Sequence, residues 1–344
     1  MKKSFQEPKN ILIRMPNWLG DFIMATPILK DIRNQFPKAK ITAMVKEPLC
    51  DLLKIDKNID DLFCFRKPTS SLFTGKEHKE IIEKIKNGNF DLGILLTNSF
   101  SSAHWFFKGK VKTRLGFSMH FRRPLLNKSI PVPKAVNHQH LVLTYKELLV
   151  PLGISFSQSN PHLDISDEEK EKSLLLLKGF GYEKGKTLVT MNPGAAYGLA
   201  KCWFPERFQE VAKQLLKDEN CYVAFLGDMF MKPLIQKIIN GLGTRAIDLS
   251  GKTDLRQLTT VISLSNVLLS NDSGPMHIAS AVNVPVVALF GSTSAVMTGP
   301  YPKGEVIHKH VNCSPCFKRV CPKDMRCMKE ISIQEVFEKV KRHV

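Results

Sequence analysis

"LLSNDSGPMHIASAVNVPVVALFGST", residues 268–293, contains the alternation that decides the fold. A short apolar run ends in the polar turn Asn271-Asp272-Ser273-Gly274-Pro275, a helical stretch follows, and a second apolar run ends at Gly291-Ser292-Thr293. Strand, helix and strand in this order indicate a parallel sheet with a helical crossover. The turn where the first strand meets the helix is either a plain connector or a place where backbone N–H groups meet an anion.

The same alternation recurs along the chain. In the first half it predicts strands at 9–15, 39–46 and 90–97, and a helix over 21–36 that ends at Phe36-Pro37. The pattern breaks in the Pro-, Ser- and Gly-rich segment 150–166. Further strands are then predicted at 186–194, 221–228, 266–272 and 284–292.

Two helix starts carry their own signal, because Ser166 with Glu169 and Ser332 with Glu335 have the spacing of capping boxes. The fold class we expect is α/β, with two Rossmann-like, doubly wound domains facing a cleft. The expected domains are residues 1–160 and 161–330, followed by a C-terminal helix in 331–344 that returns toward the first domain.

The composition, 43% apolar and 24% charged over 344 residues, is that of an ordinary soluble globular protein. No apolar run reaches the roughly 18–20 residues of a membrane span, and no signal peptide is recognisable, so we expect a cytoplasmic protein. Residues 1–160 carry 26 Lys and Arg against 13 Asp and Glu, whereas residues 161–344 carry 24 against 19. The basic first half indicates nucleic acid, a phosphorylated substrate or a membrane surface as partner, or merely a solvated basic face.

One nucleotide-binding motif is excluded. Residues 179–187, GFGYEKGKT, resemble a P-loop, but Gly181 leaves three residues before Gly185 and Gly179 leaves five. The P-loop needs four residues there, and it follows a strand, whereas this segment precedes one. The sequence therefore argues against a P-loop NTPase.

In the opening stretch the polar turn lies at the carboxyl end of its strand, where open α/β sheets bind ligands. Gly274 lets the backbone approach a ligand closely, and Pro275 fits the first helical turn. The free N–H groups and the helix dipole suit a phosphate. Alternatively, Asp272 or Ser273 caps the helix without any ligand, and His277 taken alone favours a structural hydrogen bond over catalysis.

A second strand end repeats this arrangement in MNPGAAYGLAKCWFPERF, residues 191–208. Asn192 and Gly194 directly follow the strand. Lys201 lies in the same loop, where it either neutralises a diphosphate leaving group or is simply solvated.

The third strand end lies in RMPNWLGDFIMATP, residues 14–27. Asn17, Gly20 and Asp21 lie where the first strand meets its helix. Asp21 is either a helix cap or a carboxylate that takes a proton from an attacking hydroxyl.

Residues 104–128 interleave basic and aromatic side chains. This composition suits a phosphorylated amphiphile, a membrane surface or nucleic acid, and nucleic acid ranks lower because no RNA-binding signature accompanies it. The bidentate geometry of arginine makes Arg122 and Arg123 the candidates for gripping phosphates.

Four cysteines, Cys313, Cys316, Cys321 and Cys327, have the spacing C-x2-C-x4-C-x5-C. Four thiols in one segment suit zinc. Because the second pair is not a C-x2-C, we favour reduced packing thiols or an adventitious disulfide, and we expect no essential metal.

Three motifs taken together resemble glycosyltransferase family 9, the bacterial lipopolysaccharide heptosyltransferases. They are GDFIMATP after the first strand, NPG…K.W at the start of the second half, and NDSGPMHIASA…PVVALFGST near the end. The late CSPCFKRVCP…RC looks like the heptosyltransferase II branch. The resemblance covers essentially the whole chain and implies the GT-B fold, with the acceptor in the first domain and the nucleotide-sugar in the second.

The resemblance also implies inverting transfer of L-glycero-D-manno-heptose from ADP-heptose to the lipopolysaccharide inner core. Asp21 matches the catalytic aspartate of the family, and Lys201 matches its phosphate-binding lysine. The other implied donor residues are Asn192, Gly194, Asp272, Ser273, Gly274 and His277. The residues implied to flank the nucleoside are Gly227, Asp228 and Thr253. The acceptor candidates are Asn17, Gly20, Arg122 and Arg123.

The implied partners are ADP-heptose, a phosphorylated Kdo–lipid A heptose acceptor and the cytoplasmic face of the inner membrane, with no nucleic acid. No cofactor and no metal are required, and a divalent cation is at most stimulatory. The alternatives are heptosyltransferase I or III, another sugar transferase of core assembly, and a non-catalytic binder of anionic lipid or nucleic acid.

Overall fold

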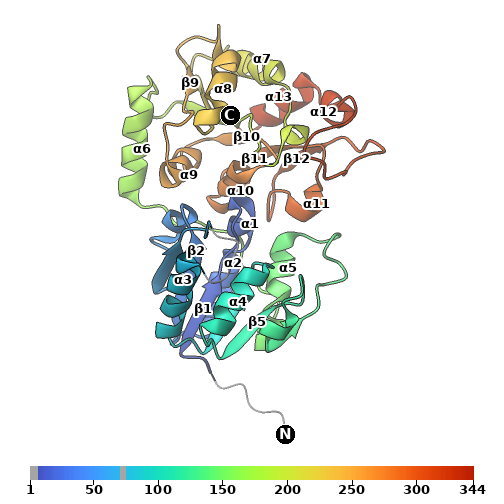
Figure 1. Cartoon of the computed structure of the whole chain (residues 1–344). Helices are drawn as coiled ribbons and strands as arrows, with labels where there is room; N and C mark the ends of the chain where they lie inside the picture. Colours follow the sequence, from blue (N-terminus) through green and yellow to red (C-terminus); the bar gives the residue numbers. More distant parts are fainter. Residues whose placement is uncertain (1–6, 70–74) are drawn as a thin grey trace. The chain divides into compact units, whose positions relative to one another are not determined.

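The computed structural model of the chain describes residues 7–69 and 75–344 (Figure 1). It divides into two compact units, Met1–Pro161 and His162–Val344. Within the described ranges each unit contains one parallel six-stranded sheet. No helix in these ranges has both the length and the apolar character needed to cross a membrane.

The first unit has the strand order β3-β2-β1-β4-β5-β6. Its strands are β1 (Asn10–Arg14), β2 (Lys40–Lys46), β3 (Asp61–Phe65), β4 (Leu92–Leu95), β5 (Thr113–Phe117) and β6 (Lys128–Ile130). Its helices are α1 (Leu19–Met24), α2 (Pro27–Gln35), α3 (Lys76–Asn87), α4 (Phe100–Lys108) and α5 (Leu141–Glu147), with short 3-10 turns η1 (Leu49–Leu53), η2 (Arg123–Leu125) and η3 (Val150–Leu152).

The second unit repeats this topology with the order β12-β11-β10-β7-β8-β9. Its strands are β7 (Thr187–Asn192), β8 (Cys221–Phe225), β9 (Ala246–Asp248), β10 (Val267–Asn271), β11 (Val286–Phe290) and β12 (Glu305–His308). Its helices are α6 (Asp167–Gly179), α7 (Pro205–Leu215), α8 (Lys232–Ile239), α9 (Leu255–Ser263), α10 (Gly274–Ala281), α11 (Ala295–Thr298), α12 (Arg326–Lys329) and α13 (Ile333–Lys341), with 3-10 turns η4 (Leu199–Lys201) and η5 (Met229–Met231).

Both orders reverse direction next to the first strand of the unit, which is the doubly wound arrangement that the alternation predicted. The reversal lies between β1 and β4 in the first unit and between β7 and β10 in the second. Ligands of such sheets bind beyond the carboxyl ends of the strands at this point. The register there pairs Ser270 with Asn192, so the polar ends of β7 and β10 are neighbours.

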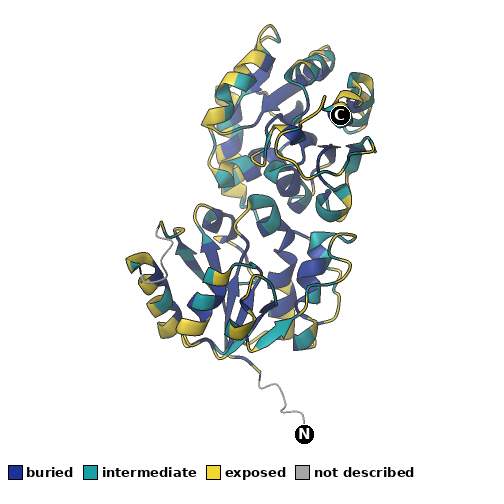
Figure 2. Ribbon diagram, turned by 45° about the vertical axis from the view of Figure 1, so that its right-hand side comes forward, coloured by how far each residue is buried: buried dark blue, intermediate teal, exposed yellow. Residues whose placement is uncertain are grey.

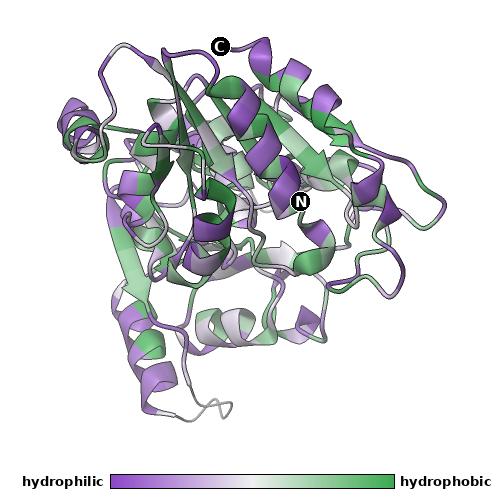
Figure 3. Cartoon of the chain, turned by 90° about the horizontal axis from the view of Figure 1, so that it is seen from above, coloured by the Kyte–Doolittle hydropathy of each residue, from purple (hydrophilic) through white to green (hydrophobic). Residues whose placement is uncertain are grey.

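Hydrophobic burial explains why the central strands form. Ile11, Leu12 and Ile13 in β1 are completely buried, as are Val267, Leu268 and Leu269 in β10. Helices cover both faces of the sheets, so these strands are apolar without alternation. Figure 2 shows the sheets in the buried colour, with exposed residues on the outer faces of the helices. Figure 3 shows hydrophobic residues concentrated on the strands.

One helix departs from the sequence prediction. The helix predicted over 21–36 is two helices, α1 and α2, because Pro27 lacks an N–H and starts a new helix after the turn at Ala25 and Thr26. The C-terminal helix α13 packs on α7 of the second unit, where Val336 and Val340 enter the hydrophobic core. Its return toward the first domain stays a prediction.

The basic and aromatic segment 104–128 is not one continuous surface. It contains the end of α4, the strand β5, the turn η2 and the first residue of β6. Trp105, Phe106 and Phe117 belong to the interior of the first unit, whereas Phe121 is 96% exposed. The alternation of residue types therefore reflects strands and a helix with one buried face each.

Candidate functional site

Asparagine side chains join the ends of β7 and β10 in the second unit. The Asn192 amide donates hydrogen bonds to the Gly194 carbonyl at 2.9 Å and to Ser273 Oγ at 2.8 Å. The Asn271 amide donates to the Pro193 carbonyl at 2.7 Å, and its oxygen accepts from the Trp203 N–H at 3.0 Å. Asn271 therefore holds the loop after β7 against β10, and the sequence analysis had not assigned it this role.

Lys201 and Asp272 form a buried ion pair at this edge. Lys201 Nζ lies 2.6 Å from Asp272 Oδ2, and the two side chains are only 13% and 4% exposed. The Thr293 hydroxyl also donates to Asp272 Oδ2, and Lys201 Nζ lies 4.9 Å from the centre of the Tyr197 ring. The sequence left open that Lys201 is simply solvated. The structure excludes this alternative, because the ammonium group is largely buried and paired with a carboxylate.

The amino end of α10 lies beside this pair. Ser273 is the N-cap residue, but its side chain makes no capping hydrogen bond and instead accepts from Asn192. Pro275 has no N–H, and the Met276 N–H donates to the Ser273 carbonyl at 3.2 Å. Within the described residues this leaves the Gly274 N–H for another acceptor. His277 is buried one turn further on. The geometry thus favours an anion over a plain side-chain cap at this position.

The three residues expected near a nucleoside lie after β8 and β9. Asp228 caps η5 by accepting from the Met231 N–H at 3.1 Å, and the Gly227 carbonyl accepts from the Gly251 N–H at 2.9 Å. A Cβ on Gly227 would lie 2.7 Å from Met231 Cβ, so the loop requires glycine. Thr253 lies just before the N-cap of α9.

Sequence reasoning missed two apolar side chains in the same turn. Phe230 is 92% exposed and Met229 is 59% exposed. Both belong to η5, directly after the carboxyl end of β8. Apolar side chains indicate a ligand-binding surface only if they are exposed, and the sequence alone does not show which apolar residues are exposed.

In the first unit, Asp21 lies in the first turn of α1. The N-cap of this helix is Trp18, which makes no side-chain capping bond, so Asp21 is not the cap. Asp21 lies close to Tyr145 of α5: burial raises the pKa of Tyr145 well above its ordinary value, and the negative charge of Asp21 raises it further. Gly20 precedes Asp21 in the same helical turn.

Asn17 is held by a residue that the sequence analysis did not single out. Arg14, at the end of β1, is 1% exposed and donates from Nη2 to Asn17 Oδ1 at 2.6 Å. It also donates to the Met15 carbonyl, and its guanidinium lies 4.5 Å from the centre of the Phe65 ring. Burial lowers the pKa of Arg14 to about 9.

The expectation for Arg122 is wrong, whereas that for Arg123 stays a prediction. Arg122 is completely buried, and it donates to the carbonyl groups of Phe117 and Thr97 and to Asn98 Oδ1. Its nitrogens are engaged by the loops after β4 and β5, so it organises them and does not grip a phosphate at the surface. Arg123 is exposed.

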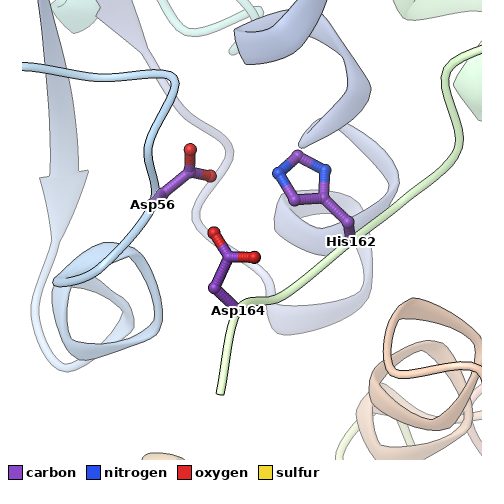
Figure 4. A group of neighbouring side chains, drawn as sticks. All are labelled: Asp56, His162 and Asp164. Atoms are coloured by element: carbon purple, nitrogen blue, oxygen red, sulfur yellow. The ribbon is translucent and has the colours of Figure 1, made fainter. Parts of the chain in front are cut away.

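Potential metal ligands occur in two other places. Figure 4 draws Asp56, which belongs to the first unit, together with His162 and Asp164, which begin the second. Neither unit contains this set by itself, and we assign no metal site to it. The four late cysteines all belong to the second unit and are free thiols.

The two doubly wound units define the fold class, which is the GT-B type. The comparison with known proteins is more specific. The sequence profile of glycosyltransferase family 9 (heptosyltransferase) matches residues 79–326, and the chain belongs to this family.

Several relatives match over nearly the whole chain. Lipooligosaccharide heptosyltransferase 2 of Campylobacter jejuni is 26% identical over 342 residues, which cover 96% of this chain and 98% of the relative. The Haemophilus ducreyi protein of the same name is 29% identical, with 86% and 87% covered.

Among solved structures, ADP-heptose lps heptosyltransferase II of Escherichia coli has a TM-score of 0.81 at 24% identity and covers 97% of this chain and 98% of its own. The family 9 glycosyltransferase of Veillonella parvula has a TM-score of 0.84 at 25% identity, with 99% and 98% covered. The GT-B fold implied by the motifs is confirmed.

Proposed function

We propose that this glycosyltransferase transfers L-glycero-D-manno-heptose from ADP-heptose to a heptose of the lipopolysaccharide inner core. The observation that carries the proposal is the buried Lys201–Asp272 pair beside the uncapped amino end of α10. The names of the Campylobacter jejuni and Escherichia coli relatives, heptosyltransferase 2 and ADP-heptose lps heptosyltransferase II, support this choice of donor and of the second-heptose reaction.

The second unit is suited to bind the donor. A diphosphate beside α10 accepts a hydrogen bond from the Gly274 N–H and draws Lys201 away from Asp272. Asp272, released from the lysine, then accepts hydrogen bonds from sugar hydroxyls. Met229 and Phe230 offer an apolar surface for the adenosine, next to Gly227, Asp228 and Thr253.

The chemistry we propose is a single inverting displacement. Asp21 takes the proton of the acceptor hydroxyl as that oxygen attacks the anomeric carbon. The bond to ADP breaks on the opposite face, and negative charge develops on the leaving diphosphate. Lys201 and the Gly274 N–H stabilise this charge where it forms. The residues involved supply the base and the electrostatic stabilisation themselves, so no cofactor is needed.

The first unit is suited to an anionic acceptor. Residues 92–146 contain nine Lys and Arg and no Asp or Glu. They form β4, α4, β5, β6 and α5, which make up one half of the sheet and its helices. We propose that Arg123 and Phe121 on this side meet the phosphates and the apolar part of the acceptor at the cytoplasmic face of the inner membrane.

The test is transfer with defined acceptors. The purified chain is incubated with ADP-heptose and lipopolysaccharide truncated after Kdo, after the first heptose, or after the second. A mass gain of one heptose only on the acceptor with one heptose supports the proposal. Gain on another acceptor assigns heptosyltransferase I or III instead, and no gain with any acceptor refutes heptose transfer.

A further inference from the structure

The irregular segment that carries Cys313, Cys316, Cys321 and Cys327 encloses a small cavity in the second unit. All four cysteines line it, together with Gly291 and Ser292 at the end of β11. The cavity volume is about 20 Å³, which is room for roughly one water-sized particle. The four cysteines are free thiols, none of them in a disulfide.

A second observation points to a ligand in this cavity. The Ser292 side chain is 2% exposed, and its Oγ is buried without a hydrogen-bond partner. A buried hydroxyl normally has a partner, because leaving it unpaired costs about 1–3 kcal/mol. A ligand bound among the thiols would lie next to this hydroxyl.

The charge of the segment suits a metal tetrathiolate. Four thiolates and one divalent ion carry a net charge of −2. Between Cys313 and Cys327 lie four cations and one carboxylate: Lys318, Arg319, Lys323, Arg326 and Asp324. Neighbouring cations stabilise thiolates, and thiolates are the form that binds metals.

We propose that Cys313, Cys316, Cys321 and Cys327 bind one thiophilic divalent metal ion, zinc or iron, in the cavity beside Ser292. Four sulfur ligands in a tetrahedron are typical of structural zinc and of iron bound by cysteine. In the described part of the chain no three of the four sulfur atoms lie within 4.8 Å of one another. Metal binding therefore closes the set by rotation of the cysteine side chains. This replaces the expectation from spacing alone, which argued against a metal.

The cysteine segment is attached to both loops of the donor site. The Arg319 carbonyl accepts from the Ala200 N–H at 3.0 Å, directly before Lys201. The Ser292 carbonyl accepts from the N–H groups of Cys316 and Phe317, directly before Thr293. The metal therefore stabilises the backbone that positions the Lys201–Asp272 pair, without touching the substrate.

The test measures metal content and thiol reactivity, so it does not depend on transferase activity. The full chain is purified without chelator, and zinc and iron are quantified by elemental analysis. We expect about one ion per chain and protection of the four thiols until a chelator removes it. Zinc or iron at this ratio supports the proposal and identifies the ion.

The variant for comparison is Cys313→Ser/Cys316→Ser, with Cys221→Ala as control, since Cys221 is a free thiol of β8 outside the cavity. The double variant loses the ion and the control keeps it. Cobalt added to the chelated wild-type chain provides a second readout that does not depend on the folding of the double variant, namely the intense absorption of cobalt–thiolate bonds. A metal-free wild-type chain that gives no cobalt signal, a disulfide among the four cysteines, or metal retained in the double variant would overturn the proposal.

Discussion

The proposed role of Asp21 as the general base can be tested with a single substitution. It lies in the first turn of α1 without serving as its cap, and a buried tyrosine is close by. We predict that Asp21→Asn lowers kcat by roughly 10²–10⁴-fold, as expected for the loss of a general base, with little change in donor affinity. Steady-state kinetics with ADP-heptose and a one-heptose acceptor provide the measurement.

The asparagine retains the size and hydrogen-bonding capacity of the side chain, so the fold should be preserved. ADP affinity and thermal unfolding of the variant are the controls. Turnover close to that of the wild type would remove Asp21 from the mechanism.

Lys201 tests the electrostatic half of the proposal. We predict that Lys201→Ala reduces kcat/KM for ADP-heptose by a factor that corresponds to roughly 2–4 kcal/mol, because the lysine neutralises charge on the departing diphosphate. The same change leaves the buried Asp272 carboxylate without its cation, which lowers stability as well.

The double variant Lys201→Ala/Asp272→Asn separates these two effects, since it removes the unpaired charge. We expect it to regain stability and to remain defective in ADP binding, measured by calorimetry. Wild-type ADP affinity in both variants would show that the pair is purely structural.

At the scale of elements, the ion pair between Glu169 and Arg256, called the clamp below, joins α6 to α9. Glu169 completes the capping box with Ser166 that the sequence predicted, and its carboxylate also accepts from Arg256 of α9. The hydrogen bond from Arg256 is the main cause that lowers the pKa of Glu169 to about 2. The stabilisation is therefore present above the ordinary pKa of about 4.5 and is lost as the pH falls toward 2.

We predict that Glu169→Gln lowers the free energy of unfolding at pH 7 by about 1–2 kcal/mol, the size of a lost helix cap. Its unfolding free energy should also depend less on pH between 5 and about 2 than that of the wild type. Urea unfolding across this range gives both quantities. Glu171→Gln, an exposed position of the same helix, is the matched control; equal pH dependence in the two variants would contradict the clamp.

The elements also show what sequence could and could not predict. The central strands β1, β2, β4, β7, β8, β10 and β11 were found because burial on both faces makes them continuous apolar runs. The edge strands β3, β6, β9 and β12, and β5 inside the sheet, were missed. They are short or partly polar, and pairing with a neighbour, not composition, fixes them.

Contacts between distant segments account for the other errors. The sequence marked Lys201 and Asp272 separately, but their pairing depends on two loops about 70 residues apart that converge at one sheet edge. Arg122 was predicted to contact phosphates, because the sequence does not show that its guanidinium binds the carbonyl groups of Phe117, at the end of β5, and Thr97, just after β4. The disulfide between Cys50 and Cys64, which joins η1 to β3, left no signal in the spacing.

For the whole molecule, the charge distribution is the property with functional consequences. The net charge is +18, and the acid-free run 92–146 of the first unit contains nine basic residues. Arg122 and Lys146 are buried, so seven of them are exposed or partly exposed. An anionic membrane attracts such a surface by about 1 kcal/mol per basic residue near it. Salt screens exposed charges beyond about 8 Å at physiological ionic strength.

We therefore predict that the chain binds vesicles containing phosphatidylglycerol, that binding falls steeply as salt rises, and that neutral phosphatidylcholine vesicles bind weakly. Cosedimentation measures all three.

Phe121→Ser/Arg123→Ser should weaken vesicle binding and raise the KM for the acceptor while leaving the KM for ADP-heptose unchanged, because only the first unit contains these residues. Lys184→Ser, an exposed position of the second unit with the same loss of charge, should change neither. Arg122→Ala, in contrast, should lower thermal stability, since it removes the buried hydrogen bonds that hold the loops after β4 and β5. Acceptor kinetics indifferent to Phe121 and Arg123, with vesicle binding insensitive to salt, would leave the positive charge as a solvated surface without a role in acceptor recognition.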